Sequence, residues 1–576
     1  MSFTWLGPTL DEEVVNLGPL ALIHPLLDRL GLAAVIDQHL VPDPQLEFSH
    51  GRVLSLLIAA RLTRPTALVN IAEWAELAGA DLLWNIPADK LNDDRLGRSL
   101  DAFFDHRHSI MAGVTLNALE LAELSLQRLH FDTTHLVFYG AYATSQPRPV
   151  SSAAELFRGD DLLDPAHITH GYLSKYRMIQ VGVTSLVDEL GAVPVMTHCL
   201  DGNRNGHTAI REQIDLLQEH LPLPPDLLIV SDRGTVSLEH IARLHRHGRS
   251  MLCAVPWNDY RVLYDANAHR LNWQEASFQS REQQRRRATG SPLPLDHYDL
   301  AVLSHTLIDP VTGADIPSRV LFVRSTAAIT EERERRQQNI AKIRSGFETL
   351  AAKLQRGHPT TTAASMQRQI ARLLGHRGAA EFFRWELLPL TANEVQQLPP
   401  PRKGFRRPTH RLVFTFDEAA ATAASSYDGL SILLTTAPLT NSGDVLFTKY
   451  KEQCYVEMTH HQFKSPLAVR PVFLKSPQRV EALVCLLGIA LQAYQMLERL
   501  YRQSVPDNAP LAVGRTTTQT LLRRFQTCGV VVKRTPLGRV VSATCPTSRQ
   551  TAILNQLGFP SVARTLRIVL VEVPTG

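Results

Sequence analysis

The chain has 576 residues, of which 44% are hydrophobic and 20% are charged. This composition is typical of a soluble globular protein with several hydrophobic cores. The formal net charge of +4 excludes a polybasic coat for nucleic acid, so any contact with DNA must come from local basic surfaces.

The first 110 residues predict a helical domain. Apolar residues recur at i, i+3 and i+4 within 20–32, 52–62 and 67–77, and prolines separate these segments. A small helical module of this kind either reads DNA sequence or packs as a bundle for dimer contacts, and the pattern leaves both open. Three acids at 11–13 precede any basic residue, so we expect no secretory signal at the N-terminus.

The segment 111–256 alternates predicted helices and strands. In chain order, the elements are a helix at 111–127, a strand around Asp132, strands at 178–187 and 192–200 joined by a hairpin, a helix at 206–220, a strand at 226–232, a helix at 237–247 and a strand at 250–256. The strand at 226–232 ends on Asp232, before a glycine turn. Ligands of open α/β sheets collect at the carboxyl ends of strands, so Asp232 is a candidate ligand.

Residues 201–212 match the letter pattern of an EF-hand calcium loop. That loop requires a preceding helix, whereas 192–200 predicts a strand. We therefore expect a turn in which Asn205 caps the following helix, and no calcium site.

The segment 257–440 predicts a large α+β insertion. Residues 298–305 and 319–323 alternate like antiparallel strands, and apolar residues between 340 and 354 step 3-4-3-4, as in a helix that pairs with a second helix at 363–375. Two basic clusters either bind phosphates or belong to solvent-exposed loops, and the sequence pattern leaves both interpretations open. The clusters are Arg281, Arg285, Arg286 and Arg287, and Arg402, Lys403, Arg406, Arg407 and Arg411.

Residues 450–464 predict a helix with an unusual polar face. At ~100° per residue, one stripe roughly 60° wide holds Tyr450, Gln453, Glu457 and Lys464. An acid flanked by a phenol, an amide and an amine suits a metal ligand beside a phosphate backbone better than it suits a core. Pro466 ends the helix, so Lys464 lies in the last turn, where its charge complements the helix dipole.

A long helix at 478–503 and a small α/β domain at 506–576 complete the chain. The longest apolar run, 482–491, is too short to span a bilayer. Six scattered cysteines without a C-x-x-C motif indicate reduced thiols rather than a disulfide or zinc framework. We expect a cytoplasmic protein without a membrane segment.

Three carboxylates stand at positions suited to a shared metal site. Asp132 lies inside a strand, Asp232 at a strand end and Glu457 on a helix face. Carboxylate oxygens are the ligands that Mg²⁺ prefers, so the three acids together predict a site for two divalent cations. Each acid alone has an ordinary alternative as a strand, turn or ion-pair residue.

These residues resemble the Asp-Asp-Glu (DDE) active site of bacterial insertion-sequence transposases with a ribonuclease H-like core. The helix resembles the subgroup signature Tyr-x-x-Arg-x-x-x-Glu-x(6)-Lys, with Gln453 in place of the arginine. Leu91–Arg98 is similar to the N-terminal module of this group. Collinear matches over about 125–505 are Phe131–Thr134, His170–Lys175, Asp201–Asn203, Ser231–Gly234, Tyr427–Gly429 and Arg470–Phe473.

The resemblance implies an α/β fold with a ribonuclease H-like mixed-sheet catalytic core. The expected domains are a helical N-terminal domain that binds DNA ends (1–110), the first part of the core (111–256), an α+β insertion domain (257–440), the second part of the core (441–505) and a small C-terminal domain (506–576). The implied activity is that of a DNA transposase, with hydrolysis at the element ends followed by strand transfer.

The resemblance also assigns roles and partners. Asp132 would bridge two Mg²⁺ or Mn²⁺ ions, and Asp232 and Glu457 would each complete one ion. Tyr450, Gln453 and Lys464 would contact DNA. The partners would be terminal inverted repeats, target DNA and a second copy in a synaptic dimer, in a prokaryotic cytoplasm near the nucleoid.

Two alternatives remain open from the sequence. Gln453 lacks the forked charge of arginine, which suggests a catalytically impaired DNA-binding derivative. A nuclease of the same fold, without strand transfer, would need the same three acids.

Overall fold

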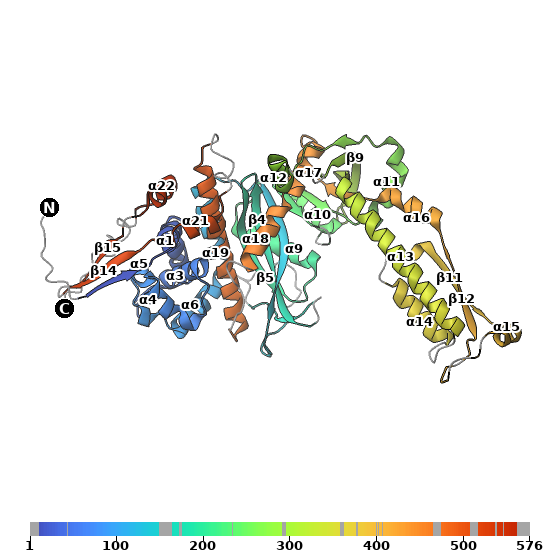
Figure 1. Cartoon of the computed structure of the whole chain (residues 1–576). Coiled ribbons are helices and arrows are strands. Elements are labelled where there is room, and N and C mark those ends of the chain that lie inside the picture. Colours follow the sequence, from blue (N-terminus) through green and yellow to red (C-terminus); the bar gives the residue numbers. More distant parts are fainter. Residues whose placement is uncertain are drawn as a thin grey trace.

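The computed structural model describes residues 11–561, except for short segments within that range. These are 43, 149–163, 172–174, 233, 235, 291–294, 357–361, 376–377, 399, 401–402, 406, 465–473, 507–515, 536–537 and 545. The protein is elongated, with a helical region at one end, a large mixed sheet in the middle and an arm at the other end (Figure 1).

The N-terminal region is helical, as expected. Its helices are α1 (Leu20–Arg29), α2 (Leu32–His39), α3 (His50–Thr63), α4 (Ile71–Leu77), α5 (Ala80–Trp84), α6 (Asp93–Asp105) and α7 (Arg107–Leu121). Side chains cap two of these helices: Ser49 accepts from the Arg52 amide at the start of α3, and Asn92 accepts from the Arg95 amide at the start of α6.

A ten-stranded sheet forms the centre of the molecule. Its strands are β2 (Arg128–Phe138), β3 (Thr169–His170), β4 (Arg177–Asp188), β5 (Gly191–Asp201), β6 (Leu228–Ser231), β7 (Ser250–Ala254), β8 (Gln274–Glu275), β9 (Tyr298–Ile308), β10 (Asp315–Ser325) and β13 (Leu430–Thr435). β4 pairs antiparallel with both β5 and β2, whereas β2, β6 and β7 run parallel. The expected α/β fold with a mixed sheet is confirmed.

Two helices connect the parallel strands. α9 (Gly206–His220) lies between β5 and β6, and α10 (Leu238–Arg246) lies between β6 and β7. The order strand, helix, strand, helix, strand from β5 to β7 is the one that the sequence pattern predicts. Asn205 caps α9 by accepting from the Thr208 amide at 2.8 Å, and a strand precedes it, so the interpretation of 201–212 as a turn and cap is confirmed.

Part of the segment 257–440 extends the central sheet. β13 pairs with β7, β10 with β13, β9 with β10 and β8 with β9, so four strands of this segment extend the central sheet. Helices α11 (Trp257–Asn267) and α12 (Arg281–Thr289) belong to the same part. The alternating pattern identified the strands but not their partners.

The rest of the segment forms a projecting arm, residues 326–424. Its elements are α13 (Thr326–Arg356), α14 (Ala363–Leu374), β11 (Phe383–Pro389), α15 (Ala392–Gln397), β12 (His410–Phe416) and α16 (Glu418–Ala424). The arm has its own hydrophobic core, in which Ile343, Phe347, Leu350 and Leu354 of α13 are buried. The predicted seam and the α13–α14 hairpin are therefore present, and a two-stranded ribbon of β11 and β12 covers them.

A single long helix, α19 (Pro477–Gln503), lies between the N-terminal helices and the sheet (Figure 1). It is long and apolar enough to cross a membrane by composition alone, but its most apolar stretch is entirely buried inside the protein. Gly488 faces β5 so closely that an added Cβ would lie 2.4 Å from Thr197 Oγ1. The glycine thus lets the helix approach the sheet.

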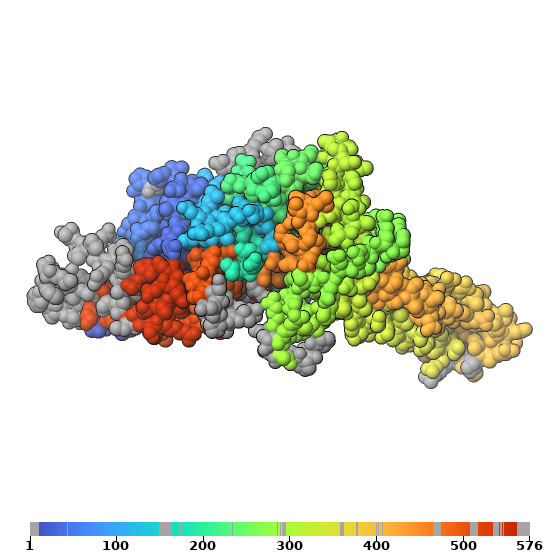
Figure 2. All heavy atoms as spheres, turned by 90° about the horizontal axis from the view of Figure 1, so that it is seen from above, coloured from blue at the N-terminus to red at the C-terminus, as the bar shows by residue number. Residues whose placement is uncertain are grey.

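The C-terminal region folds against the N-terminal region. It contains α21 (Thr518–Arg524), β14 (Val530–Thr535), β15 (Gly538–Ala543) and α22 (Ser548–Gln556). β14 pairs antiparallel with both β15 and β1 (Asp11–Val15), which joins the two ends of the chain in one sheet. Figure 2 shows these C-terminal elements, in red, beside the N-terminal helices, in blue, and the arm at the opposite end.

Candidate active site

Two of the three candidate acids are neighbours across parallel strands. Phe131 of β2 pairs in register with Ser231 of β6. The residues that follow them, Asp132 and Asp232, therefore lie next to each other where this strand pairing ends. Asp132 lies within β2, whereas Asp232 directly follows the end of β6 and is exposed. The buried apolar run 228–231 forms the strand that brings Asp232 to this edge.

The third acid is supplied by helix α18 (Gln453–Lys464), which packs against β2, β4 and β5. Val456 and Phe463 are buried and anchor the helix, while Glu457 is exposed. The helix therefore holds Glu457 over the part of the sheet that carries Asp132.

The electrostatics of Asp132 show that these charges lie close together. Burial raises the pKa of Asp132 to about 6, and the charges of Asp232 and Glu457 add to this rise. Two contributions oppose it: the Thr133 amide donates to Asp132 Oδ1 at 2.7 Å, and the nearby Lys464 is positive. An acid whose ionised form is disfavoured by neighbouring acids gains from a cation placed among them.

The three acids neighbour one another without forming a closed cage. Among the described residues, the one group of three ligand side chains whose atoms all lie within 4.8 Å of one another is His108, Glu481 and Cys485. Both oxygens of Glu481 already accept from arginines, Arg107 Nε at 2.9 Å and Arg148 Nη2 at 2.6 Å. This buried group is therefore a structural ion-pair network, and the exposed acids remain the better candidate for metal binding.

Tyr450 lies beside Asp232 but not on the same helix as Glu457, which corrects the expected continuous helix. It belongs to α17 (Gly443–Lys451), and the helix is interrupted at Glu452. Glu452 pairs with Arg128 Nη1 at 2.6 Å, a contact between this turn and the start of β2. The Tyr450 hydroxyl donates to Asp232 Oδ1 at 3.3 Å, so the phenol reaches the site from a second helix.

Gln453 faces the interior of the protein. It is 9% exposed, and its Oε1 accepts from Nδ1 of the buried His130 at 2.7 Å. Burial lowers the pKa of His130 to about 3, so the imidazole is neutral at ordinary pH and donates its Nδ1 proton to the amide oxygen. The expected contact between Gln453 and DNA does not fit this placement, because the side chain links α18 to β2 instead.

Lys464 and His460 complete the surroundings of Asp132. Lys464 is exposed at the last turn of α18, and its charge lowers the pKa of Asp132. His460 Nδ1 lies 3.4 Å from Asp132 Oδ2, and burial lowers the pKa of His460 to about 4. His460 follows Glu457 by three residues in the sequence, but helical spacing alone does not predict its contact with Asp132, because that contact crosses from helix to sheet.

Parts of the matching motifs lie outside the described residues. These are Tyr172–Ser174, Arg233, Arg470–Phe473 and the helix-ending Pro466. Most of the described parts of the other motifs lie on or directly beside strands of the central sheet. Asp201, for example, ends β5, and its carboxylate accepts from the amides of Arg148 and His167 at 3.2 and 2.9 Å.

Comparisons with known proteins give one family match and one remote structural similarity. Residues 12–116 match a family described as a domain of unknown function (DUF4277), which covers the N-terminal helices and β1. No curated protein matches the chain. A solved structure titled "Cryo-EM structure of piggyBac transposase synaptic complex with hairpin DNA (SNHP)" is similar, with 9% identity and a TM-score of 0.32, over 97% of this chain and 86% of that one. A TM-score of this size does not define a fold.

Proposed function

We propose that this protein is a DDE-type DNA transposase that cuts and joins phosphodiester bonds with two bound divalent cations. The observation that supports the proposal is that the charges of Asp232, Glu457 and Lys464, from the end of β6 and from α18, all act on the pKa of Asp132 in β2. The expected domain division, ribonuclease H-like core and DNA partners are part of the same proposal.

The donor set fits Mg²⁺ or Mn²⁺. All three acids offer hard carboxylate oxygens, and their mutual repulsion, seen at Asp132, is relieved by a cation between them. An open arrangement also suits ions that keep coordination sites for water and substrate phosphates. Asp132 would contact both ions, and Asp232 and Glu457 one each.

The residues of this chain position the reacting groups. When bound, the two ions lower the pKa of a water and neutralise the leaving oxygen. The Tyr450 hydroxyl orients the Asp232 carboxylate, and the neutral His460 sits against Asp132 without competing as a cation. Lys464 binds a backbone phosphate as a point charge. The buried hydrogen bond between Gln453 and His130 joins α18 to β2 and thereby fixes the position of Glu457 relative to the sheet.

The same site serves both strand cleavage and strand transfer, because a 3′-hydroxyl can replace water as the nucleophile. The proposed partners are therefore terminal inverted repeats, target DNA and a second copy of the chain that holds the other end.

The proposal is tested by Asp232→Asn, with Asp226→Asn as a matched control. Asp226 is exposed just before the opposite end of β6, so both changes remove one charge from the same strand region. We expect Asp232→Asn to reduce Mn²⁺-dependent cleavage of end-bearing duplex by at least about 100-fold, since metal ions supply several kcal/mol of charge stabilisation. DNA binding should persist in both variants.

A second readout does not depend on activity. Mn²⁺ should raise the melting temperatures of the wild-type protein and of Asp226→Asn, because a ligand that binds only the folded state stabilises it. The melting temperature of Asp232→Asn should rise much less, because this variant lacks one of the proposed metal ligands. Equal shifts in all three proteins would refute the metal site.

Two alternative functions give different products. A nuclease of the same fold would cut labelled ends but would not join them to a target plasmid. A catalytically impaired derivative would bind the ends and cut nothing. The inward position of Gln453 removes the main sequence argument for the impaired derivative, because the residue then has a structural role.

A further inference from the structure

Positive charge is concentrated in the arm. Residues 326–424 contain 16 of the chain's 60 basic residues and 9 of its 56 acidic residues, a net charge of +7. The remaining residues, by the same count, carry a net charge of −3. The small charge of the whole chain thus hides a basic arm on a nearly neutral body, which is a distribution expected of a surface for a polyanion.

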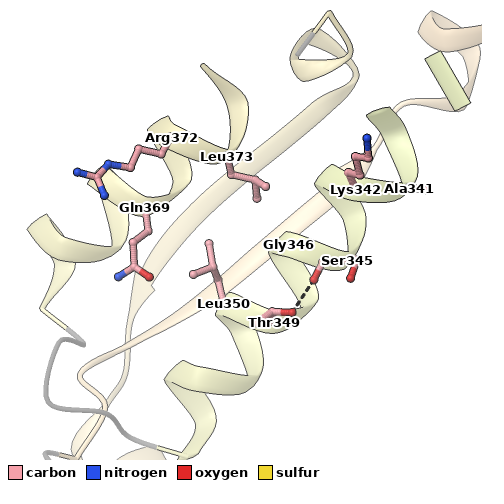
Figure 3. A pocket seen from close by; sticks show the side chains of 9 residues that line it. All are labelled: Ala341, Lys342, Ser345, Gly346, Thr349, Leu350, Gln369, Arg372 and Leu373. Atoms are coloured by element: carbon pink, nitrogen blue, oxygen red, sulfur yellow. Dashed lines mark hydrogen bonds between the residues drawn. The ribbon is translucent and has the colours of Figure 1, made fainter. Parts of the chain in front are cut away.

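The arm contains an open groove between α13 and α14, with a volume of about 780 Å³ (Figure 3). Lys342 stands on the α13 side and Arg372 on the α14 side, and neither makes an ion pair within the described part of the chain. Ser345, Thr349 and Gln369 add hydroxyl and amide groups. No carboxylate lines the groove.

The cationic surface continues along α13 beyond the groove. Lys353 and Arg356 are exposed, and at ~100° per residue they fall within a stripe roughly 60° wide that includes Lys342. On α14, Arg368 is exposed one turn before Arg372. A row of cations beside an open groove fits an extended chain of phosphates better than a small ligand, which would need an enclosed site.

The arm is held firmly at its root on the central sheet. β10 continues directly into α13, and the Ala327 amide donates to Asp296 Oδ1 at 2.8 Å. At the return point, the Gly429 amide donates to Glu332 Oε2 at 2.9 Å, and Arg336 pairs with the buried Asp428. The groove is therefore carried at a fixed direction from the sheet that holds the candidate acids.

The distance along the arm matches the repeat of duplex DNA. Residues 342–350 follow the start of α13 by 16–24 residues, which is about 24–36 Å at 1.5 Å per residue. One turn of duplex DNA spans about 34–36 Å. A duplex that lies along the arm can thus place one backbone segment near its root and the next equivalent segment at the groove.

We propose that the groove between α13 and α14 binds the phosphate backbone of a DNA duplex about one helical turn away from the root of the arm. This contact rests on the proposed function for the identity of the duplex, but it is separate from the acids that cut it. The contact in the groove gives the enzyme a second, sequence-independent binding site for the DNA that it processes.

The test measures how DNA affinity depends on salt for single neutralised cations. Each phosphate contact contributes about 0.9 to the slope of log affinity against log salt concentration. We expect Lys342→Gln and Arg372→Gln each to reduce the slope by about 0.9 on a duplex of about 42 base pairs, four helical turns. Arg333→Gln is the matched control, since Arg333 is exposed on the opposite side of α13 from Lys342.

The outcomes separate this proposal from the proposed function. Unchanged slopes in the two groove variants, or an equal fall in the Arg333 control, would overturn the groove as a phosphate site even if the enzyme cleaves DNA. If the two groove variants reduce the slope as expected but the wild-type protein shows no Mn²⁺-dependent cleavage, the catalytic proposal alone is overturned. A change in dimer dissociation with an unchanged slope would assign the groove to contact between copies and also refute DNA binding there.

Discussion

Replacing Gln453 by arginine, the residue of the resembling signature, should destabilise this protein. Gln453 is 9% exposed, and its hydrogen-bond partner His130 is fully buried. The charge of Arg128 already lowers the pKa of His130. A guanidinium at position 453 would therefore be placed near an existing positive charge. The adjacent acid, Glu452, is already paired with Arg128 at 2.6 Å.

The magnitude follows from these contacts. A buried charge without a partner costs about 3–5 kcal/mol, and loss of the bond to His130 adds about 1 kcal/mol. Gln453→Met has a similar size and removes only the hydrogen bond, so we expect about 1–3 kcal/mol for that variant. The arginine variant should therefore be the less stable of the two by at least about 1 kcal/mol.

Urea unfolding of the two variants and the wild type measures these differences, and DNA affinity is measured in parallel. An arginine variant that is as stable as the wild type and binds DNA with a steeper salt dependence would refute the inward placement. Gln453 would then face the DNA, as the signature implies.

Three further predictions concern the scaffold. Gly488→Ala should destabilise by about 1–3 kcal/mol in urea unfolding, because the new methyl group overlaps Thr197; Thr197→Ala in the same chain should recover only part of the loss, since the Cβ of residue 197 still lies 2.7 Å from that methyl group. Burial lowers the pKa of His240 from 6.5 to about 4, so stability should fall as pH decreases through this window; between pH 7.5 and 5 the wild type should lose about 2 kcal/mol more than His240→Phe, and equal losses would refute the assignment. Glu481→Gln removes the buried carboxylate that pairs with both Arg107 and Arg148 and should cost about 3–5 kcal/mol, seen as a lower melting temperature.

Local patterns predicted the elements of the fold well, and they predicted long-range pairing poorly. The buried run 228–231 and the 3-4-3-4 spacing along α13 each reflect a short-range periodicity, and both elements are present. Pairing of β13 with β7 depends on residues about 180 positions apart, and nothing in either strand's alternation specifies that partner.

In the candidate site, too, local features could be predicted from the sequence and long-range contacts could not. The strand positions of Asp132 and Asp232 followed from sequence, because each is set by its own strand. The break at Glu452 did not, since no glycine or proline marks it and its partner Arg128 lies on β2. The inward turn of Gln453 depends on His130, again on β2. Contacts between helix and sheet decide which side of α18 meets solvent.

The sheet that joins the two ends of the chain has a consequence for biosynthesis. Val15 of β1 pairs with Val530 of β14, so the first strand must wait for about 515 further residues. At roughly 5–20 residues per second, that delay is about 25–100 s on the ribosome. During this interval the edge of β1 lacks its native neighbour, and the sheet that contains β1 can form only after the whole central sheet has been translated.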